Sequence, residues 1–391
     1  MEMYKFSRAS SLPSMKSGQE DGFVRTARVP YRVLYALLFT LIIVIIALLL
    51  PSSVRRSPHP VFGQTNFLIH DDYQVFTYNS TYPLTTPTYA GDVKTFRIAV
   101  VADQDTNSKV KDTMWVSWLK TGSLSLHRDG TLSVKWDSTM TKLETRMAEK
   151  GRGAELSDLC VFNGRLYTVG DRTGIVFEIL NGRLIPWVIL QDGDGHVDKG
   201  FKGEWMTVKD RRLYIGSIGK VWTSQAGVYL NDRPQYIKVI GPTGHVEHRP
   251  WASVYNRMRA GAGIEEPGYI IHESASWSDV HQKWFFLPRR ASDKSYNDVD
   301  DEHRATNILI SADEAFSDVQ SSPVSLLNEY RGYSSFKFLP DSQDKIIVAI
   351  KSEENQGKIA SYISAFDLSG HTLLSEEKIA DDLKFEGIEF I

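Results

Sequence analysis

The 391-residue sequence has a single cysteine, Cys160. One cysteine cannot form an intrachain disulfide, so no covalent cross-link within the chain stabilises this fold. Cys160 lies between Leu159 and Val161. This apolar setting is typical of a small buried residue and not of a reactive thiol.

The sequence also lacks a strong charge imbalance and the common hydrolase motifs. Its formal net charge is -3 at pH 7, so charge gives no indication of a nucleic-acid partner. There is no P-loop, Rossmann fingerprint, HExxH or GxSxG motif, which argues against the enzyme classes that those motifs serve. The composition, 42% hydrophobic and 11% aromatic, is that of a globular, β-rich protein with enough apolar residues for a core.

One long stretch without charge is present near the N-terminus, at residues 33–50. As a helix it would span about 27 Å, close to the thickness of a bilayer core. Basic residues gather before it, which predicts a cytoplasmic tail over residues 1–32, a signal-anchor helix over residues 33–50 and a type II orientation. The alternative is a cleaved signal peptide, but the apolar run exceeds the usual length and no A-x-A site follows.

Residues 51–95 are rich in proline, serine and threonine, which predicts a lumenal stem. The triplet Asn79-Ser80-Thr81 is an N-glycosylation sequon on the predicted lumenal side, so we expect Asn79 to be glycosylated. Proteolysis within the stem would release a secreted form.

From residue 96 onward, short apolar runs alternate with turns. Asn163-Gly164 and Asn181-Gly182 each separate two such runs, and Asn-Gly is the strongest short signal for a β-hairpin. Only residues 143–150 and 251–260 have a helical pattern. The sequence therefore predicts an all-β domain over residues 96–391.

The hairpins form a repeat in which an acidic or hydroxyl residue leads into a strand, a polar turn and a second strand that begins with a basic residue. The leading positions are Ser157, Glu204, Glu273, Ser334 and Glu386. The fifth repeat ends at the C-terminus, and its missing second strand matches residues 97–101. This pattern predicts a five-bladed β-propeller closed by pairing of the C-terminal strand with the first strand of the domain. The alternative is a β-sandwich with coincidental hairpins.

The leading residues would converge where the innermost strands of a propeller begin. Three of the leading residues, Glu204, Glu273 and Glu386, carry carboxylates. We expect no lysine between them, so they would repel one another. A hard cation with oxygen ligands relieves that repulsion, which predicts a Ca²⁺ site. The alternative is that these side chains satisfy backbone groups in a wet channel.

The second strands end in polar clusters, and equivalent ends lie on one face of a propeller. Arginine and lysine there suit phosphate groups, carboxylates can hold water or metal, and a tryptophan such as Trp115 can stack on a base. The candidate residues are Asp103, Asp105, Lys150, Arg152, Asp171, Arg172, Arg289, Arg290, Lys351 and Glu353. For any one of them, a solvated loop charge is the alternative.

Nine stretches resemble the calcium-activated nucleotidases, or apyrases. They are RIAVVADQDT (97–106), EKGRGAELSD (149–158), DRTG (171–174), GFKGEW (200–205), HES (272–274), FFLPRRA (285–291), SSFKF (334–338), KSEE (351–354) and EGIEFI (386–391). The resemblance covers residues 75–391 and implies a five-bladed propeller that holds Ca²⁺ and hydrolyses nucleoside di- and triphosphates.

Matched residue by residue to these stretches, the resemblance implies a calcium shell. Its members would be Ser157, Asp158, Glu204, Glu273, Ser334 and Glu386. The resemblance also implies a catalytic role for Asp105, beside Asp103, and places Trp115 near the base. Anchored members resemble Golgi or endoplasmic-reticulum enzymes that favour UDP and GDP. We therefore expect a lumenal Ca²⁺-dependent nucleoside diphosphatase. A non-catalytic calcium-binding propeller that binds partners is the alternative, and the oligomeric state is left open, a homodimer included.

Overall fold

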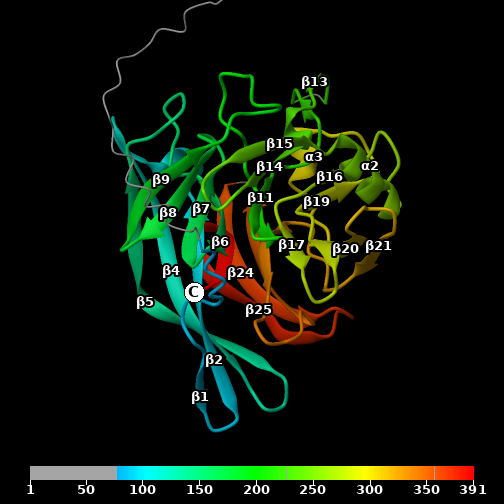
Figure 1. Ribbon diagram of the computed structural model, residues 1–391. Coiled ribbons are helices and arrows are strands. Elements are labelled where there is room, and N and C mark those ends of the chain that lie inside the picture. The colour runs from blue at the N-terminus through cyan, green and yellow to red at the C-terminus, as the bar shows by residue number, and fades with distance from the viewer. Residues whose placement is uncertain (1–76, 226, 356) are drawn as a thin grey trace, which may run out of the picture. The chain divides into compact units, whose positions relative to one another are not determined.

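The computed structural model describes residues 77–225, 227–355 and 357–391 (Figure 1). The predicted cytoplasmic tail, the signal-anchor helix and most of the stem lie outside the described residues. Among the residues that are described, no helix combines the length and the apolar character needed to cross a bilayer.

Five four-stranded antiparallel units, which we number as blades 1 to 5, make up the described fold (Figure 1). From the axis outward, blade 1 contains β26 (Lys384–Phe390), β2 (Val93–Asp103), β4 (Met114–Leu126) and β5 (Leu132–Thr145). Blade 2 contains β6 (Leu156–Phe162), β7 (Arg165–Gly170), β8 (Ile175–Leu180) and β9 (Arg183–Ile189). Blade 3 contains β10 (Trp205–Lys209), β11 (Arg212–Gly216), β14 (Tyr236–Ile240) and β15 (Val246–Pro250). Blade 4 contains β17 (Ala275–Ser278), β18 (Lys283–Phe286), β20 (Ile308–Asp313) and β21 (Val319–Pro323). Blade 5 contains β22 (Arg331–Phe338), β23 (Ile346–Asn355), β24 (Lys358–Asp367) and β25 (Thr372–Asp381).

Short elements decorate the blades. Strands β1 (Thr88–Ala90) and β3 (Lys109–Lys111) extend blade 1, and two small sheets pair β12 (Trp222–Thr223) with β13 (Tyr229–Asn231) and β16 (Tyr269–Ile271) with β19 (Arg290–Ser292). The described helices are α2 (Ala252–Gly261), α3 (Asp298–Asp301) and the 3-10 turns η2 (Asp105–Ser108) and η3 (Arg233–Gln235).

The C-terminal strand closes the ring as the sequence predicts. Strand β26 pairs with β2 in antiparallel register, with Ile98 opposite Phe390 and Val100 opposite Ile388. Each innermost strand contacts the next, in the order β26, β6, β10, β17, β22 and back to β26. The prediction of a five-bladed propeller is therefore confirmed, and the sandwich alternative is excluded.

The core lies between the blades. Side chains of β2 alternate faces: Ile98 and Val100 pack with residues of blade 5, whereas Ala99 and Val101 pack with residues of blade 2. Similar apolar clusters fill the other blade interfaces. Near the axis the strands approach closely, because a Cβ atom added to Gly387 would lie 2.7 Å from the Asp158 backbone.

Both Asn-Gly hairpins are present, with positive φ at Asn163, Gly164, Asn181 and Gly182. A type I′ turn requires this conformation at both central residues, and Asn-Gly adopts it readily. The helix predicted over residues 251–260 corresponds to α2.

Two boundaries differ from the expectation. The pattern over residues 143–150 does not form a helix, because β5 continues to Thr145 and pairs with β4. The propeller unit also begins before residue 96. Strand β1 precedes it, the backbone N–H of Asn79 donates to Asn163, and the Tyr82 hydroxyl donates to Glu389 at 3.0 Å. Asn79 itself is exposed, and its glycosylation stays a prediction.

Candidate active site

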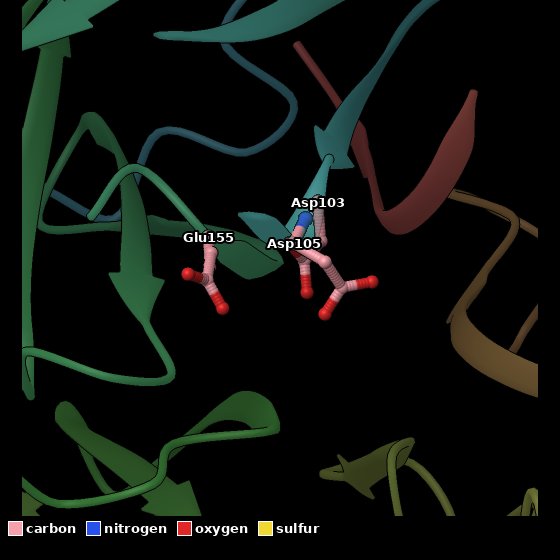
Figure 2. Close-up of side chains that lie close together, drawn as sticks. All are labelled: Asp103, Asp105 and Glu155. Atoms are coloured by element: carbon pink, nitrogen blue, oxygen red, sulfur yellow. The ribbon is translucent and has the colours of Figure 1, made fainter. Parts of the chain in front are cut away.

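Three carboxylates from blade 1 and blade 2 meet at one mouth of the central channel. Asp103 ends β2, Asp105 begins η2, and Glu155 directly precedes β6. Carboxylate oxygens of all three lie within 4.8 Å of one another and face a common space (Figure 2). Asp105 has a left-handed backbone (φ 47°), and its N–H donates to Asp103 at 2.7 Å. Such conformations concentrate at functional sites.

These three residues belong to a continuous network of ion pairs that we call the charged cluster. Its carboxylates are Asp103, Asp105, Glu155, Asp171, Glu204, Glu273, Glu354 and Glu386, and its basic residues are Arg152, Arg172, Lys202, Arg289 and Lys384. Carboxylates therefore outnumber basic groups, eight to five, within this set.

Two lysines and two arginines form the main bridges. Lys384 Nζ lies 2.8 Å from Asp105 and 3.4 Å from Glu386, and Arg152 lies 3.2 Å from Asp105. Arg289 binds Glu273 at 2.5 Å and Glu386 at 3.1 Å, and it also pairs with Glu354. Lys202 joins Asp171, at 2.8 Å, to Glu204.

Burial and mutual repulsion raise the pKa of several carboxyl groups in the cluster. Burial, followed by repulsion from Glu273, raises the pKa of Glu204 and of Glu386 to about 8 although Lys202 and Lys384 oppose the shift. Burial also holds the pKa of Asp103 well above its ordinary value. For Asp105, burial would raise the pKa, but Lys384 and Arg152 outweigh it and the pKa is lowered. The surroundings of Asp105 therefore favour its charged form, whereas burial disfavours the charged form of Asp103.

The channel mouth fits a hard dication. Glu204 and Glu273 lie just before β10 and β17, and Glu386 lies near the start of β26. Glu273 repels both Glu204 and Glu386, and Glu204 also repels Glu386. Ser157 Oγ is buried without a hydrogen-bond partner, and so is Asp171 Oδ1. Excess negative charge, oxygen donors and unpartnered buried oxygens match the preferences of Ca²⁺.

The expectation that no lysine lies among these carboxylates is wrong. Lys202 pairs with Glu204, and Lys384 with Glu386. Both lysines lie two residues before their partners. In an extended chain, residues two apart point to the same face. The spacing of each lysine and glutamate in the sequence is therefore the signal that could have indicated these ion pairs. Four members of the charged cluster were not among the predicted site residues: Glu155, Lys202, Glu354 and Lys384.

The side chain of Asp158 is held by other groups of the protein, and its part in a calcium shell stays a prediction. Its carboxylate lies 3.2 Å from Lys337 Nζ and accepts hydrogen bonds from Met206 N, Leu159 N and Ser335 Oγ. It is therefore fully occupied inside the channel. A bulge between Leu156 and Asp158 changes the register at this point, which the sequence pattern did not reveal.

Lys351 and Glu353 lie in a second network, outside the charged cluster. Lys351 pairs with Glu376 at 3.2 Å, and Glu353 binds Arg331, Lys358 and the Tyr362 hydroxyl. The neighbouring Glu354 instead reaches Arg289 and Lys384. Successive strand residues point to opposite faces, so Glu353 and Glu354 join different networks. The substrate-binding role of Glu353 stays a prediction.

Trp115 and Lys150 are not part of the ion-pair network of the charged cluster, and their substrate-binding roles stay predictions. Trp115 is buried, and its indole N–H donates to the Gly151 carbonyl at 2.9 Å, so it anchors the 149–153 loop and does not present an open face to a base. The Lys150 side chain is 84% exposed and pairs with Glu149 at 3.5 Å.

Arg290 is the least compensated basic side chain at this edge of the cluster. It is buried, and its Nη1 has no hydrogen-bond partner. Burial and the adjacent Arg289 lower its pKa. A buried guanidinium with a free N–H group is suited to an anionic ligand.

A family model described as Apyrase matches residues 104–391. The chain belongs to the apyrase family. The matched range contains every member of the charged cluster except Asp103, which immediately precedes it. The resemblance that the nine sequence stretches indicate is confirmed.

Relatives in the apyrase family share about half of their residues with this chain. It is 51% identical to "Soluble calcium-activated nucleotidase 1" of Rattus norvegicus over 334 residues, which cover 85% of this chain and 82% of that protein. It is 52% identical to the protein of the same name in Mus musculus, over 80% of this chain and 78% of that one. It is 45% identical to "Apyrase apy-1" of Caenorhabditis elegans, over 76% of this chain and 84% of that protein.

Proposed function

We propose that this protein hydrolyses nucleoside diphosphates, and also triphosphates, in a Ca²⁺-dependent reaction that releases phosphate. The observation that carries the proposal is the charged cluster itself. It gathers basic side chains and excess carboxylates at one channel mouth, with the unpartnered Arg290 at its edge. Two rodent relatives named calcium-activated nucleotidases support the same activity.

The residues that would hold Ca²⁺ are Ser157, Glu204, Glu273, Ser334 and Glu386. When bound, the ion supplies positive charge that offsets the carboxylates and the phosphates. Ser334 Oγ donates to the Phe385 carbonyl at 3.2 Å, which keeps its hydroxyl beside the strand that carries Glu386.

The basic residues would bind the phosphates. Arg152 and Lys384 contact Asp105, and Arg289 contacts Glu386 in the same cluster. Arg290, buried next to Arg289 in the chain, adds a further N–H group. Phosphoryl transfer depends mainly on positioning and charge neutralisation. A phosphate oxygen that binds Arg152 or Lys384 would compete with Asp105 for the same donors. Substrate binding would thereby release Asp105 to act on water.

Asp105 is the best-placed residue to orient and deprotonate the attacking water. Its side chain is 45% exposed, whereas that of Asp103 is 4% exposed. The water oxygen bonds to the terminal phosphorus, the bond from that phosphorus to the bridging oxygen breaks, and Asp105 accepts the water proton. The products are inorganic phosphate and the nucleotide shortened by one phosphate.

We also propose the setting of this activity. The uncharged run at residues 33–50, the basic residues before it and the sequon at Asn79 favour a type II protein of the Golgi or endoplasmic reticulum with a lumenal propeller. The preferred substrates there would be UDP and GDP, which glycosyl transfer produces in the lumen.

Phosphate release by the full-length protein tests the proposal. We expect turnover of UDP, GDP and ADP with Ca²⁺, a loss of at least about tenfold when EGTA replaces Ca²⁺, and faster release from UDP and GDP than from ADP. Mg²⁺ in place of Ca²⁺ should restore little activity, because it demands a tighter octahedral shell. Protein that binds Ca²⁺ but releases no phosphate from any nucleotide would instead be a non-catalytic calcium-binding propeller.

A further inference from the structure

Three of the five leading residues of the repeat occupy β-bulges on the innermost strands of their blades. The pairing of β6 with β7 skips Ser157, that of β22 with β23 skips Ser334, and that of β26 with β2 skips Glu386. The extra residue of a bulge is unpaired in its ladder, and the bulge redirects its side chain. The relative positions of these three residues therefore depend on how the three bulges are fixed to one another.

One buried side chain, the carboxylate of Asp158, connects the strands that carry these bulges. It accepts from the Met206 N–H of β10 at 2.7 Å and from Ser335 Oγ of β22 at 2.8 Å. The same Ser335 Oγ accepts from the Ile388 N–H of β26 at 3.3 Å. Asp158 itself belongs to β6, so these contacts join the innermost strands of blades 1, 2, 3 and 5.

Lys337 of β22 supplies the opposite charge. Its Nζ lies 3.2 Å from Asp158 Oδ2 and donates to the Met206 carbonyl at 3.4 Å. The side chains of Asp158, Ser335 and Lys337 are all buried. A buried charge is costly unless it is paired and hydrogen-bonded, so the lysine keeps the carboxylate among the innermost strands. We call Asp158, Ser335 and Lys337 the brace.

Each backbone group that the brace fixes lies one or two residues from a proposed Ca²⁺-binding residue. The four pairs are Ser157 and Asp158, Glu204 and Met206, Ser334 and Ser335, and Glu386 and Ile388. A backbone held at one residue leaves its neighbours little freedom, because each residue has only two soft dihedral angles. Gly387 permits the close approach of β26, since a Cβ atom there would lie 2.7 Å from the Asp158 backbone.

We propose that the brace is a positioning device that sets the spacing of the Ca²⁺-binding residues. The Asp158 carboxylate acts through the strands and not as a ligand, because hydrogen bonds from the protein already occupy both of its oxygens. The inference rests on the proposed function, which places Ca²⁺ at these residues. Ca²⁺ takes about 6–8 oxygen ligands in a flexible shell and Mg²⁺ a tighter octahedral one, so the spacing determines which ion is preferred.

Two changes cut the brace without altering the net charge. Ser335→Ala removes the hydroxyl that joins Asp158 to β26. Asp158→Asn together with Lys337→Met removes the ion pair as a unit, whereas removal of one partner alone would leave an uncompensated buried charge. An effect of either change on Ca²⁺ affinity is therefore not an effect of charge. Ser364→Ala, at a buried serine of β24 in blade 5, is the matched control.

Calorimetric binding of Ca²⁺ and of Mg²⁺ to the full-length protein tests the proposal, with melting in EGTA to show that each variant is folded. We expect Ser335→Ala to lower Ca²⁺ affinity at least threefold and the double variant at least tenfold. The ratio of Ca²⁺ to Mg²⁺ affinity should fall in both, whereas Ser364→Ala should bind both ions like the wild type. All variants should melt cooperatively, because the apolar clusters between the blades are unchanged.

Ca²⁺ affinity within twofold of the wild type in either folded variant would overturn the proposal. An unchanged ratio of Ca²⁺ to Mg²⁺ affinity would also overturn it, because a merely weakened fold affects both ions alike. If the double variant does not fold, Ser335→Ala decides. Wild-type protein that binds Ca²⁺ but releases no phosphate would refute the proposed function alone, and the variant affinities would still decide the role of the brace. Wild-type protein that binds no Ca²⁺ would refute both.

Discussion

Asp105→Asn is expected to lower kcat for UDP hydrolysis by about 10²- to 10⁴-fold, the usual contribution of a general base. Asparagine keeps the size of the side chain but cannot accept the proton of the attacking water. Thermal unfolding should change little, since the Asp105 side chain is 45% exposed and ion pairs at such positions contribute little stability. The measurements are phosphate release at saturating UDP and the melting temperature of the same preparation.

Asp112→Asn is the matched control. Asp112 is an exposed aspartate seven residues further along the chain, and its replacement should leave both quantities unchanged. Retained turnover in Asp105→Asn would remove Asp105 from the chemistry. A melting temperature that falls in step with activity would show instead that Asp105 supports the fold.

Deletion of residues 386–391 is expected to abolish both the fold and Ca²⁺ binding. The deletion removes most of β26, including the fully buried Ile388 and Phe390, and leaves β2 without its inner partner. These two side chains alone contribute about 3–6 kcal/mol by burial, against a total stability of about 5–15 kcal/mol for a typical domain. Circular dichroism and Ca²⁺ binding by calorimetry measure the two losses.

Glu386→Gln separates ring closure from metal binding. Glutamine keeps the strand and the apolar contacts but loses the charge, so we expect a folded protein with Ca²⁺ affinity lowered at least tenfold. A truncated chain that still melts cooperatively and binds Ca²⁺ would mean that the ring closes without β26.

The architecture could be predicted because its signals are local. Asn163-Gly164 and Asn181-Gly182 specify hairpins by backbone conformation alone. The closing strand could be predicted because residues 97–101 and 386–391 complete one repeat. By contrast, the pattern over residues 143–150 suits a helix in isolation, and pairing with β4 makes its first part a strand.

The site was predicted less completely, because its contacts depend on register. Glu353 and Glu354 are neighbours on one strand and face opposite ways, so only Glu354 pairs with Arg289 of the charged cluster. The bulge at Leu156 and Asp158 determines which way Asp158 points, and the partner of its carboxylate, Lys337, lies on a different blade. Long-range pairs of this kind have no signal in a single sequence.

We expect the channel mouth to hold one Ca²⁺ on which phosphate release depends. The most direct test is a Ca²⁺ titration of one preparation of full-length protein, followed in parallel by calorimetric binding and by phosphate release from UDP. We predict one tightly bound Ca²⁺ per chain, with activity rising over the same concentration range, and loss of both in Glu204→Gln. Full activity in EGTA, or Ca²⁺ binding with no effect on turnover, would show that phosphate release does not depend on an ion at the channel mouth.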